Sequence, residues 1–423
     1  MRNLIVEIED TGIPAGVVQL VERLPDPFAL QDETTITLKF AALKFVYNTG
    51  LALLATWRTA LPAHVKVEVD DSGCTVSTKR LLIKTGFLEI IEKGVAAKSS
   101  YNYEGKVPIQ PIVYGSTTEE TIRSITGILD MFVGPLHNTE SFRVMLSELC
   151  ENTFVHAQFE TPGFICANYH KTPNRLEIAI ADSGIGIRAS YLEGTNEEAK
   201  ANITAGVSPL ELAIAEGGSS KRYSYPGHFG YGLFLVRRLI EENFGRLTII
   251  SGSECINIER YHKQHQMLKN GWNGTFVGLL IDLERPLPLE QIYEETGLGA
   301  PTSQRPDSES HEEIAPPTPH QTASFIPADL PEIELTQYGT QLLTRETGIA
   351  IRADIATVLA RGGTVKVVLD GVEDITPSVA DECFGKLAES LGRENFMRRI
   401  ILAGGSPLMS RLIELVVNNR VPL

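Results

Sequence analysis

The segment SELCENTFVHA, residues 147–157, places three polar side chains at helical spacing. Glu148, Asn152 and His156 follow one another at intervals of four, so a helix would carry all three on one face. A carboxylate can take a proton from an attacking water, and an amide oxygen one turn away can ligate a hard cation such as Mg²⁺. The pair therefore indicates water activation beside a metal ion. The alternative is a solvated polar helix face, which the segment by itself favours.

A second polar group follows a strand pattern. In RLEIAIADSGIGI, residues 175–187, apolar residues alternate as in a half-buried strand, and Asp182 ends the run. Gly184 and Gly186 permit positive φ and a close approach of backbone. A buried Asp at a strand end can accept the amino hydrogens of a base. The alternative is a strand that ends in an Asx-type turn, which needs no ligand.

A third motif is rich in glycine and leads into a helix pattern. It is PGHFGYGLFLVRRLIEENFG, residues 226–245, with glycines at Gly227, Gly230 and Gly232. N–H groups at the start of a helix bind anions such as phosphate. The G-K-[ST] of a Walker loop is missing, and so are the strand and acidic partner of a Rossmann fingerprint. The alternative is a flexible loop that is capped into a helix.

Two weaker patterns lie further along the chain. GWNGTFVGLLIDL, residues 271–283, predicts a turn into a buried strand, where the Thr275 hydroxyl could reach a ligand. Threonine is also simply a good strand former. His262 and His265 have a spacing of three, but no neighbouring carboxylate or cysteine set completes a metal site. A solvated loop or helix is the better interpretation of these histidines.

The composition excludes several classes of protein. The 423 residues contain 38 Lys+Arg and 53 Asp+Glu, which gives a net charge of −15, and this argues against nucleic-acid binding by bulk charge. The apolar stretches are shorter than the roughly 20 residues of a membrane span. No signal peptide is recognisable, and the five cysteines form no C-x-x-C pair. We expect a cytoplasmic protein with no membrane or nucleic-acid partner.

Alternating strand and helix patterns predict α/β domains around a central segment that holds the chemistry. Residues 1–97 form a small α/β domain, and residues 112–285 hold the motifs above. The central order is long helix, strand, turn, irregular stretch, glycine-rich turn, helix, strand and strand. Proline and polar residues predict a flexible linker at 299–330. Residues 331–423 form a second small α/β domain.

The order of the four motifs is more specific than any one of them. E-x-x-x-N, D-x-G-x-G, G-x-x-G-x-G-L and G-T-F follow one another along the chain. In this order they resemble the GHKL ATP-binding domain of gyrase, heat-shock chaperones, histidine kinases, mismatch-repair ATPases and anti-sigma-factor kinases. The resemblance covers roughly 112–285. It implies an α/β sandwich in which helices cover one face of a mixed sheet, and it implies ATP and Mg²⁺ as cofactors.

The resemblance also implies a role for each motif residue. Glu148 is the general base in the hydrolysing branches, Asn152 ligates the Mg²⁺ that bridges the phosphates, and His156 lies where the helix approaches phosphate. Asp182 binds the adenine amino group. The other positions line the rest of the nucleotide: Gly184 and Gly186 beside the ring, Gly227, Gly230 and Gly232 along the phosphates, and Thr275 at the adenine end. Residues 188–226 would be a mobile lid over ATP.

Histidine phosphorelay is not expected. The nearest candidate phosphoacceptor, His137, sits in a Gly/Pro-flanked turn and not on a dimerisation helix. The glycine-rich motif before the helix departs from the family in one residue. It ends in G-Y-G-L, residues 230–233, where G-L-G-L is commoner, so one side chain differs and the glycines are kept.

The C-terminal domain resembles STAS-like relatives of anti-sigma-factor antagonists through residues 365–387. Ser378 occupies the position of their phosphorylatable serine, although Thr376-Pro377 replaces the Asp that usually precedes it. The alternative for Ser378 is ordinary helix N-capping. The N-terminal domain resembles the same STAS-like fold more faintly.

Three functions are compatible with this organisation. The first is a slow Mg²⁺-dependent ATPase whose lid closure switches contacts with STAS-like domains or a partner. The second is a serine/threonine kinase of the anti-sigma type that acts on a STAS-like domain. The third is a non-enzymatic nucleotide-binding scaffold. Domains of this type often form homodimers, but no heptad pattern in the sequence identifies one.

Overall fold

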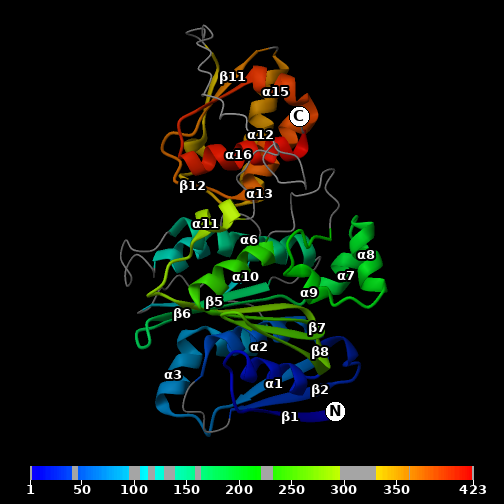
Figure 1. The fold of residues 1–423 in the computed structure, drawn as a ribbon. Coiled ribbons are helices and arrows are strands. Elements are labelled where there is room, and N and C mark those ends of the chain that lie inside the picture. The colour runs from blue at the N-terminus through cyan, green and yellow to red at the C-terminus, as the bar shows by residue number, and fades with distance from the viewer. Residues whose placement is uncertain are drawn as a thin grey trace. The chain divides into compact units, whose positions relative to one another are not determined.

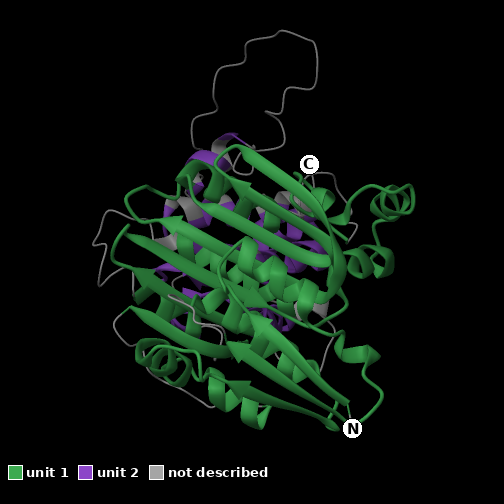
Figure 2. Ribbon diagram, turned by 90° about the horizontal axis from the view of Figure 1, so that it is seen from below, with its two compact units in different colours: residues 1–288 green, residues 289–423 purple. Residues whose placement is uncertain are grey.

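The computed structural model describes residues 2–40, 46–94, 105–112, 120–127, 139–157, 163–220, 232–295, 330–361 and 363–421. The chain divides into two compact units, Met1–Pro288 and Leu289–Leu423 (Figure 2). No helix among the described residues combines the length and the apolar character needed to cross a membrane.

The N-terminal part of the first unit is a parallel three-stranded sheet with helices. The strands lie in the order β1-β2-β3. Their inward side chains alternate along each strand, as Ile36, Leu38 and Phe40 of β2 do, and these three are fully buried. The elements are β1 Arg2–Ile8, α1 Ala15–Arg23, β2 Thr34–Phe40, α2 Asn48–Ala60, β3 Val65–Asp70, α3 Val76–Lys84 and α4 Phe87–Lys93.

The remainder of the first unit is a five-stranded sheet with the order β4-β5-β6-β8-β7. All four pairings between these strands are antiparallel, where the resemblance implies a mixed sheet. The strands are β4 Lys106–Ile112, β5 Gly163–His170, β6 Arg175–Ala181, β7 Arg246–Glu259 and β8 His262–Asp282. On one face pack α6 Thr139–Ala157 and α10 Gly232–Asn243, so the expected α/β sandwich is confirmed (Figure 1).

The opposite face of this sheet is covered by the N-terminal part, chiefly by α2 (Figure 1). The core is continuous across the two parts because α2 is buried along most of its length and packs on β5 and β6. The Thr56 hydroxyl donates to the Ala181 carbonyl at 3.3 Å. The thiol of Cys166 likewise donates to the Asn48 carbonyl. The five-stranded sheet is therefore buried on both faces.

Three short helices stand where the sequence predicts an irregular stretch. They are α7 Gly186–Glu193, α8 Glu197–Thr204 and α9 Pro209–Ala213. The side chains of Asn196 and Ser208 cap α8 and α9 by accepting backbone N–H groups. Tyr191, Ile203 and neighbouring apolar residues give the three helices a small core of their own.

The second unit is a small α/β domain with a parallel sheet of order β13-β11-β9 and a separate parallel pair, β10 and β12. Its elements are α11 Leu289–Glu295, β9 Glu332–Glu334, β10 Gln341–Leu342, α12 Arg345–Ala360, β11 Val365–Val368, β12 Asp374–Ile375, α13 Pro377–Ala380, a π-helical turn Asp381–Gly385, α14 Lys386–Leu391, α15 Arg393–Arg399, β13 Ile400–Ala403 and α16 Pro407–Arg420.

Candidate functional site

Asp182 follows the last residue of β6 and is 7% exposed. Its Oδ1 accepts the N–H of Gly184 at 2.8 Å and the N–H of Thr275 at 3.2 Å. The Gly184 bond is the Asx-type turn that the sequence offers as an alternative. It uses only one oxygen, and no hydrogen bond to Oδ2 is present among the described residues. Asp182 thus combines a fixed turn with one carboxyl oxygen that accepts no hydrogen bond from the described residues.

The backbone around Asp182 is fixed by contacts that the sequence motifs do not predict. The Trp272 indole donates to the Asp182 carbonyl at 3.0 Å. The Ser251 hydroxyl accepts from the N–H of Ile187 and donates to the carbonyl of Gly274. Gly274 has φ +111°, and a Cβ there would stand 2.1 Å from the Asp182 carbonyl oxygen. Gly186, of the D-x-G-x-G motif, has φ +73° as the sequence predicts, and a Cβ there would meet the Ser251 hydroxyl.

Burial raises the pKa of the Asp182 carboxyl to about 7, and the N–H donors of Gly184 and Thr275 lower it only in part. An Asp in the unfolded chain has a pKa of about 3.9. Between these two pKa values the unfolded chain releases the proton of Asp182 more readily than the folded protein does. The stability that the protonated carboxyl contributes is therefore complete below about pH 4 and is lost as the pH rises to about 7. The loss reaches at most about 4 kcal/mol.

We expect the free energy of unfolding of the nucleotide-free protein, relative to that of Asp182→Asn, to decrease between about pH 5 and about pH 8. Urea denaturation of both proteins at the two pH values measures this. The Asn variant is the reference because every other titrating group is shared. Parallel pH profiles for the two proteins would show that Asp182 does not titrate in this range.

Glu148 and Asn152 lie one turn apart on α6 and reach the start of α10. The contact appears at Gly232, the first residue of α10. A Cβ on Gly232 would stand 3.1 Å from Glu148 Oε2 and 3.4 Å from Asn152 Nδ2. The carboxylate and the amide are therefore brought together against the N-terminus of a 12-residue helix, where backbone N–H groups and the helix dipole favour an anion.

The C-terminal end of α6 connects this pair to Asp182. Thr153, next to Asn152, packs against Gly163 at the start of β5. A Cβ on Gly163 would be 2.7 Å from Thr153 Cγ2 and 3.4 Å from Asp182 Cβ. The close approach of α6 and β5 depends on this glycine. Because of this approach, Glu148 and Asn152 lie on the same side of the sheet as the Asp182 carboxyl.

Other expected site residues are placed less completely. Thr275 lies inside the long strand β8, and its backbone binds Asp182 through both its N–H and its carbonyl. His156 lies in α6, but its side chain is outside the described part. Gly227 and Gly230 also lie outside the described residues, as do His137 and residues 299–329 of the expected linker.

His262 and His265 belong to β8 and not to a loop or helix. His265 Nε2 lies 2.9 Å from Glu254 Oε2. Among the described residues, no group of three His, Cys, Asp or Glu side chains is arranged to hold a metal ion.

In the second unit, Ser378 lies in α13 and is 7% exposed. The Thr376 hydroxyl accepts the N–H of Val379 at 3.3 Å, so Thr376 and not Ser378 is the capping residue. Pro377 is the first residue of this helix, a position that suits proline, so the helix begins before Ser378 and the expected capping by Ser378 is not found.

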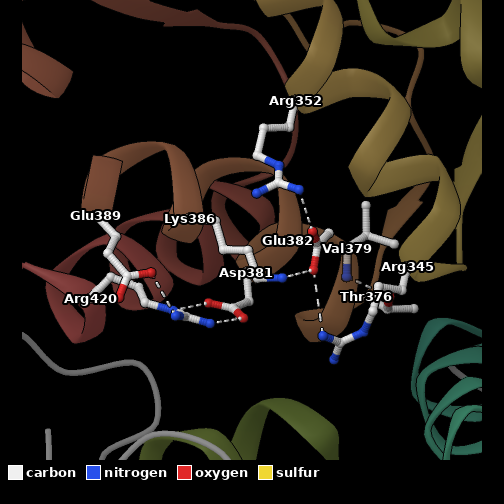
Figure 3. A network of polar contacts seen from close by, with 9 residues as sticks. All are labelled: Arg345, Arg352, Thr376, Val379, Asp381, Glu382, Lys386, Glu389 and Arg420. Atoms are coloured by element: carbon white, nitrogen blue, oxygen red, sulfur yellow. Dashed lines mark hydrogen bonds and ion pairs between the residues drawn. The ribbon is translucent and has the colours of Figure 1, made fainter. Parts of the chain in front are cut away.

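The two acids that follow Ser378 are buried and paired with cations (Figure 3). Arg420 binds Asp381 through both of its oxygens, at 2.9 and 2.8 Å. Glu382 is 1% exposed and contacts Arg352 at 2.8 Å, Lys386 at 2.5 Å and Arg345 at 3.5 Å. A buried carboxylate needs such partners, and these tie α12, α14 and α16 to the π-helical turn.

Comparison with protein families assigns both regions. The model of the family described as histidine kinase-, DNA gyrase B- and HSP90-like ATPase matches residues 137–280. The model of a STAS-like domain of unknown function matches residues 347–408. No curated protein matches the chain.

Residues 137–280 are thus a GHKL ATPase domain, and a STAS-like domain follows it, which confirms these two resemblances. The ATPase family supports nucleotide binding and ATPase- or kinase-type activity. A STAS-like fold for the N-terminal part stays a prediction.

Proposed function

We propose that the protein binds ATP with Mg²⁺ and hydrolyses it slowly, with Glu148 as the general base. The observation that carries this proposal is the convergence of Glu148 and Asn152 on Gly232, at the start of α10. A helix N-terminus offers a phosphate its N–H groups, and the carboxylate beside it can take a proton from water. Asp182, with one oxygen left for a ligand, would accept the adenine amino group.

The residues present fit a magnesium ion. In phosphate-transfer sites Mg²⁺ is usually bound by one or two protein oxygens, by water and by the phosphates themselves. The Asn152 amide provides one such oxygen beside the helix N-terminus. Bound there, the ion would neutralise phosphate charge, while Glu148 holds and orients the water and receives its proton.

The helices α7, α8 and α9 would form the described part of the lid. Leu233, the residue after Gly232, packs against their small core. The Lys263 ammonium pairs with Glu211 of α9, and the Glu254 carboxylate accepts from Ser208. The three helices are thus joined to both α10 and the β7–β8 strands. A change of lid position on ATP binding would therefore be passed to α10 and to the β7–β8 strands, and this change would be the signal to the STAS-like domain or to a protein partner.

Kinase activity toward Ser378 remains the second hypothesis, and the burial of Ser378 argues against it. We expect incubation of the full chain with labelled ATP and Mg²⁺ to release free phosphate and leave Ser378 unmodified. Phosphate release and mass spectrometry of the recovered chain measure the two products. Phosphoserine at 378 would favour the kinase instead. If neither product forms although ATP raises the melting temperature, the protein is a nucleotide-binding scaffold.

A further inference from the structure

The face of the five-stranded sheet opposite Asp182 carries a large cleft. Its volume is about 1090 Å³, and its lining includes α3, β4, the end of β5 and the start of β6 (α3, β5 and β6 are labelled in Figure 1). Glu177 lies in this cleft, and successive side chains of a strand point to opposite faces. Glu177 therefore lies on the other face of β6 from Asp182, and the cleft is separate from the nucleotide site.

One row of side chains crosses the sheet at this cleft. Lys106 of β4 is opposite Asn168 of β5, and Asn168 is opposite Glu177 of β6. Glu177 is opposite Leu280 of β8, which is opposite Arg246 of β7. All five residues line the cleft. The row is mostly polar, although the rest of this face packs on the apolar α2.

Buried polar atoms near the row have no hydrogen-bond partner in the described part of the chain. Asn168 is 7% exposed, and its Oδ1 is one of these atoms. Both amide atoms of Asn48, the first residue of α2, are in the same condition, but Asn48 does not line the cleft. Glu177, by contrast, accepts from the Thr49 hydroxyl and lies 2.9 Å from His170 Nε2. A buried polar atom without a hydrogen-bond partner destabilises the fold. The Asn168 oxygen therefore indicates that a water or a ligand binds at this part of the cleft.

The charge of the lining identifies the kind of ligand. The lining contains two carboxylates, Asp10 and Glu177, and five cationic residues: Arg80, Lys84, Lys106, Arg175 and Arg246. Both carboxylates already accept hydrogen bonds from the protein. Among the described residues, Arg80, Lys106 and Arg175 have no carboxylate within ion-pair distance. In a chain of net charge −15, such a local excess of positive charge favours an anion.

We propose that this cleft binds a phosphorylated small molecule, with the phosphate against Arg80, Lys106 and Arg175. Arginine and lysine bind phosphate through charge-assisted hydrogen bonds. The rings of Tyr47 and His170, whose centroids are 6.2 Å apart, form a wall for the organic part of the ligand. The volume is sufficient, because small-molecule sites usually measure about 300–1,000 Å³. This proposal does not depend on ATP hydrolysis at the other face.

Titration calorimetry of the full chain with inorganic pyrophosphate tests the proposal. We expect binding to wild type that weakens about tenfold in each of Arg175→Gln, Lys106→Gln and Arg80→Gln. Arg80 is exposed on α3, so its variant is informative even if one of the others folds poorly. Lys66→Gln removes an equal charge from an exposed position of β3, and this variant should bind pyrophosphate as wild type does. The melting temperature of each variant reports its folding.

Two results would overturn the proposal. One is the absence of pyrophosphate binding to wild type at millimolar concentration. The other is binding of equal strength in wild type and all three cleft variants, which would place the anion elsewhere, for instance at the start of α10. ATP hydrolysis measured on the same variants separates the two proposals, because loss of the cleft should leave turnover unchanged.

Discussion

Glu148→Ala protein is expected to bind ATP about as tightly as wild type and to hydrolyse it about 10²–10⁴ times more slowly. That range is what a positioned general base contributes to a reaction. The expectation depends on the position of Glu148 Oε2 beside the first residue of α10, where the terminal phosphate would lie. Phosphate release and equilibrium ATP binding, measured on the same preparation, separate turnover from affinity.

Two further variants sharpen the Glu148 experiment. Glu148→Gln keeps the shape of the side chain and removes only its basicity, so it should be as inactive as the Ala variant. Glu242→Gln makes the same change on the outer side of α10, where Glu242 pairs with Arg238 at 3.7 Å, and should keep wild-type turnover. Unchanged phosphate release in both Glu148 variants would remove this residue from the mechanism.

Asp182→Asn should weaken ATP binding by about 10²-fold. A hydrogen bond to a charged group is worth up to about 3 kcal/mol, and the new amide would turn one donor toward the adenine amino group. The fold should remain, because the Asn oxygen can still accept from Gly184 and Thr275. Calorimetric titration with a non-hydrolysable ATP analogue, next to a melting curve, measures affinity and folding separately.

Asp282→Asn is the matched control for the Asp182 variant. Asp282 also ends a strand and accepts a backbone N–H, that of Glu284, at 3.0 Å. Its replacement removes a similar carboxylate that lies away from the proposed adenine position, and ATP affinity should be unchanged. Equal affinities of wild type and Asp182→Asn would exclude Asp182 as the residue that binds the base.

The regular elements of this fold could be predicted from local patterns. The segment TTITLKF, residues 34–40, alternates between apolar and polar residues and predicts a strand, which is found as Thr34–Phe40. The sequence also predicts a helix at 407–418, which is found as Pro407–Arg420. A clear period of two or of 3.6 identified both. Strand β1 and helix α1 were not predicted, and neither were the helices α7 to α9. These helices are short, and side-chain caps and a small shared core stabilise them more than any long periodic pattern does.

The motif residues of the site could also be found by order and spacing, but their supporting residues could not. Nothing local in the sequence indicates that Gly274 must pass within contact of the Asp182 carbonyl, or that Trp272 bonds to it. These contacts join residues about ninety positions apart and exist only once β6 and β8 pair. The packing of α2 on the second face of the sheet also could not be predicted, because it too joins residues that are far apart in the sequence.

The central claim is that Asp182 and the Glu148–Asn152 pair serve one nucleotide. A crystal structure of the full chain with Mg²⁺ and a non-hydrolysable ATP analogue tests it most directly. We expect the adenine amino group within hydrogen-bond distance of Asp182 Oδ2 and the terminal phosphate at the start of α10, near Glu148. A nucleotide bound with its base away from Asp182, or with its phosphates away from Gly232, would contradict it.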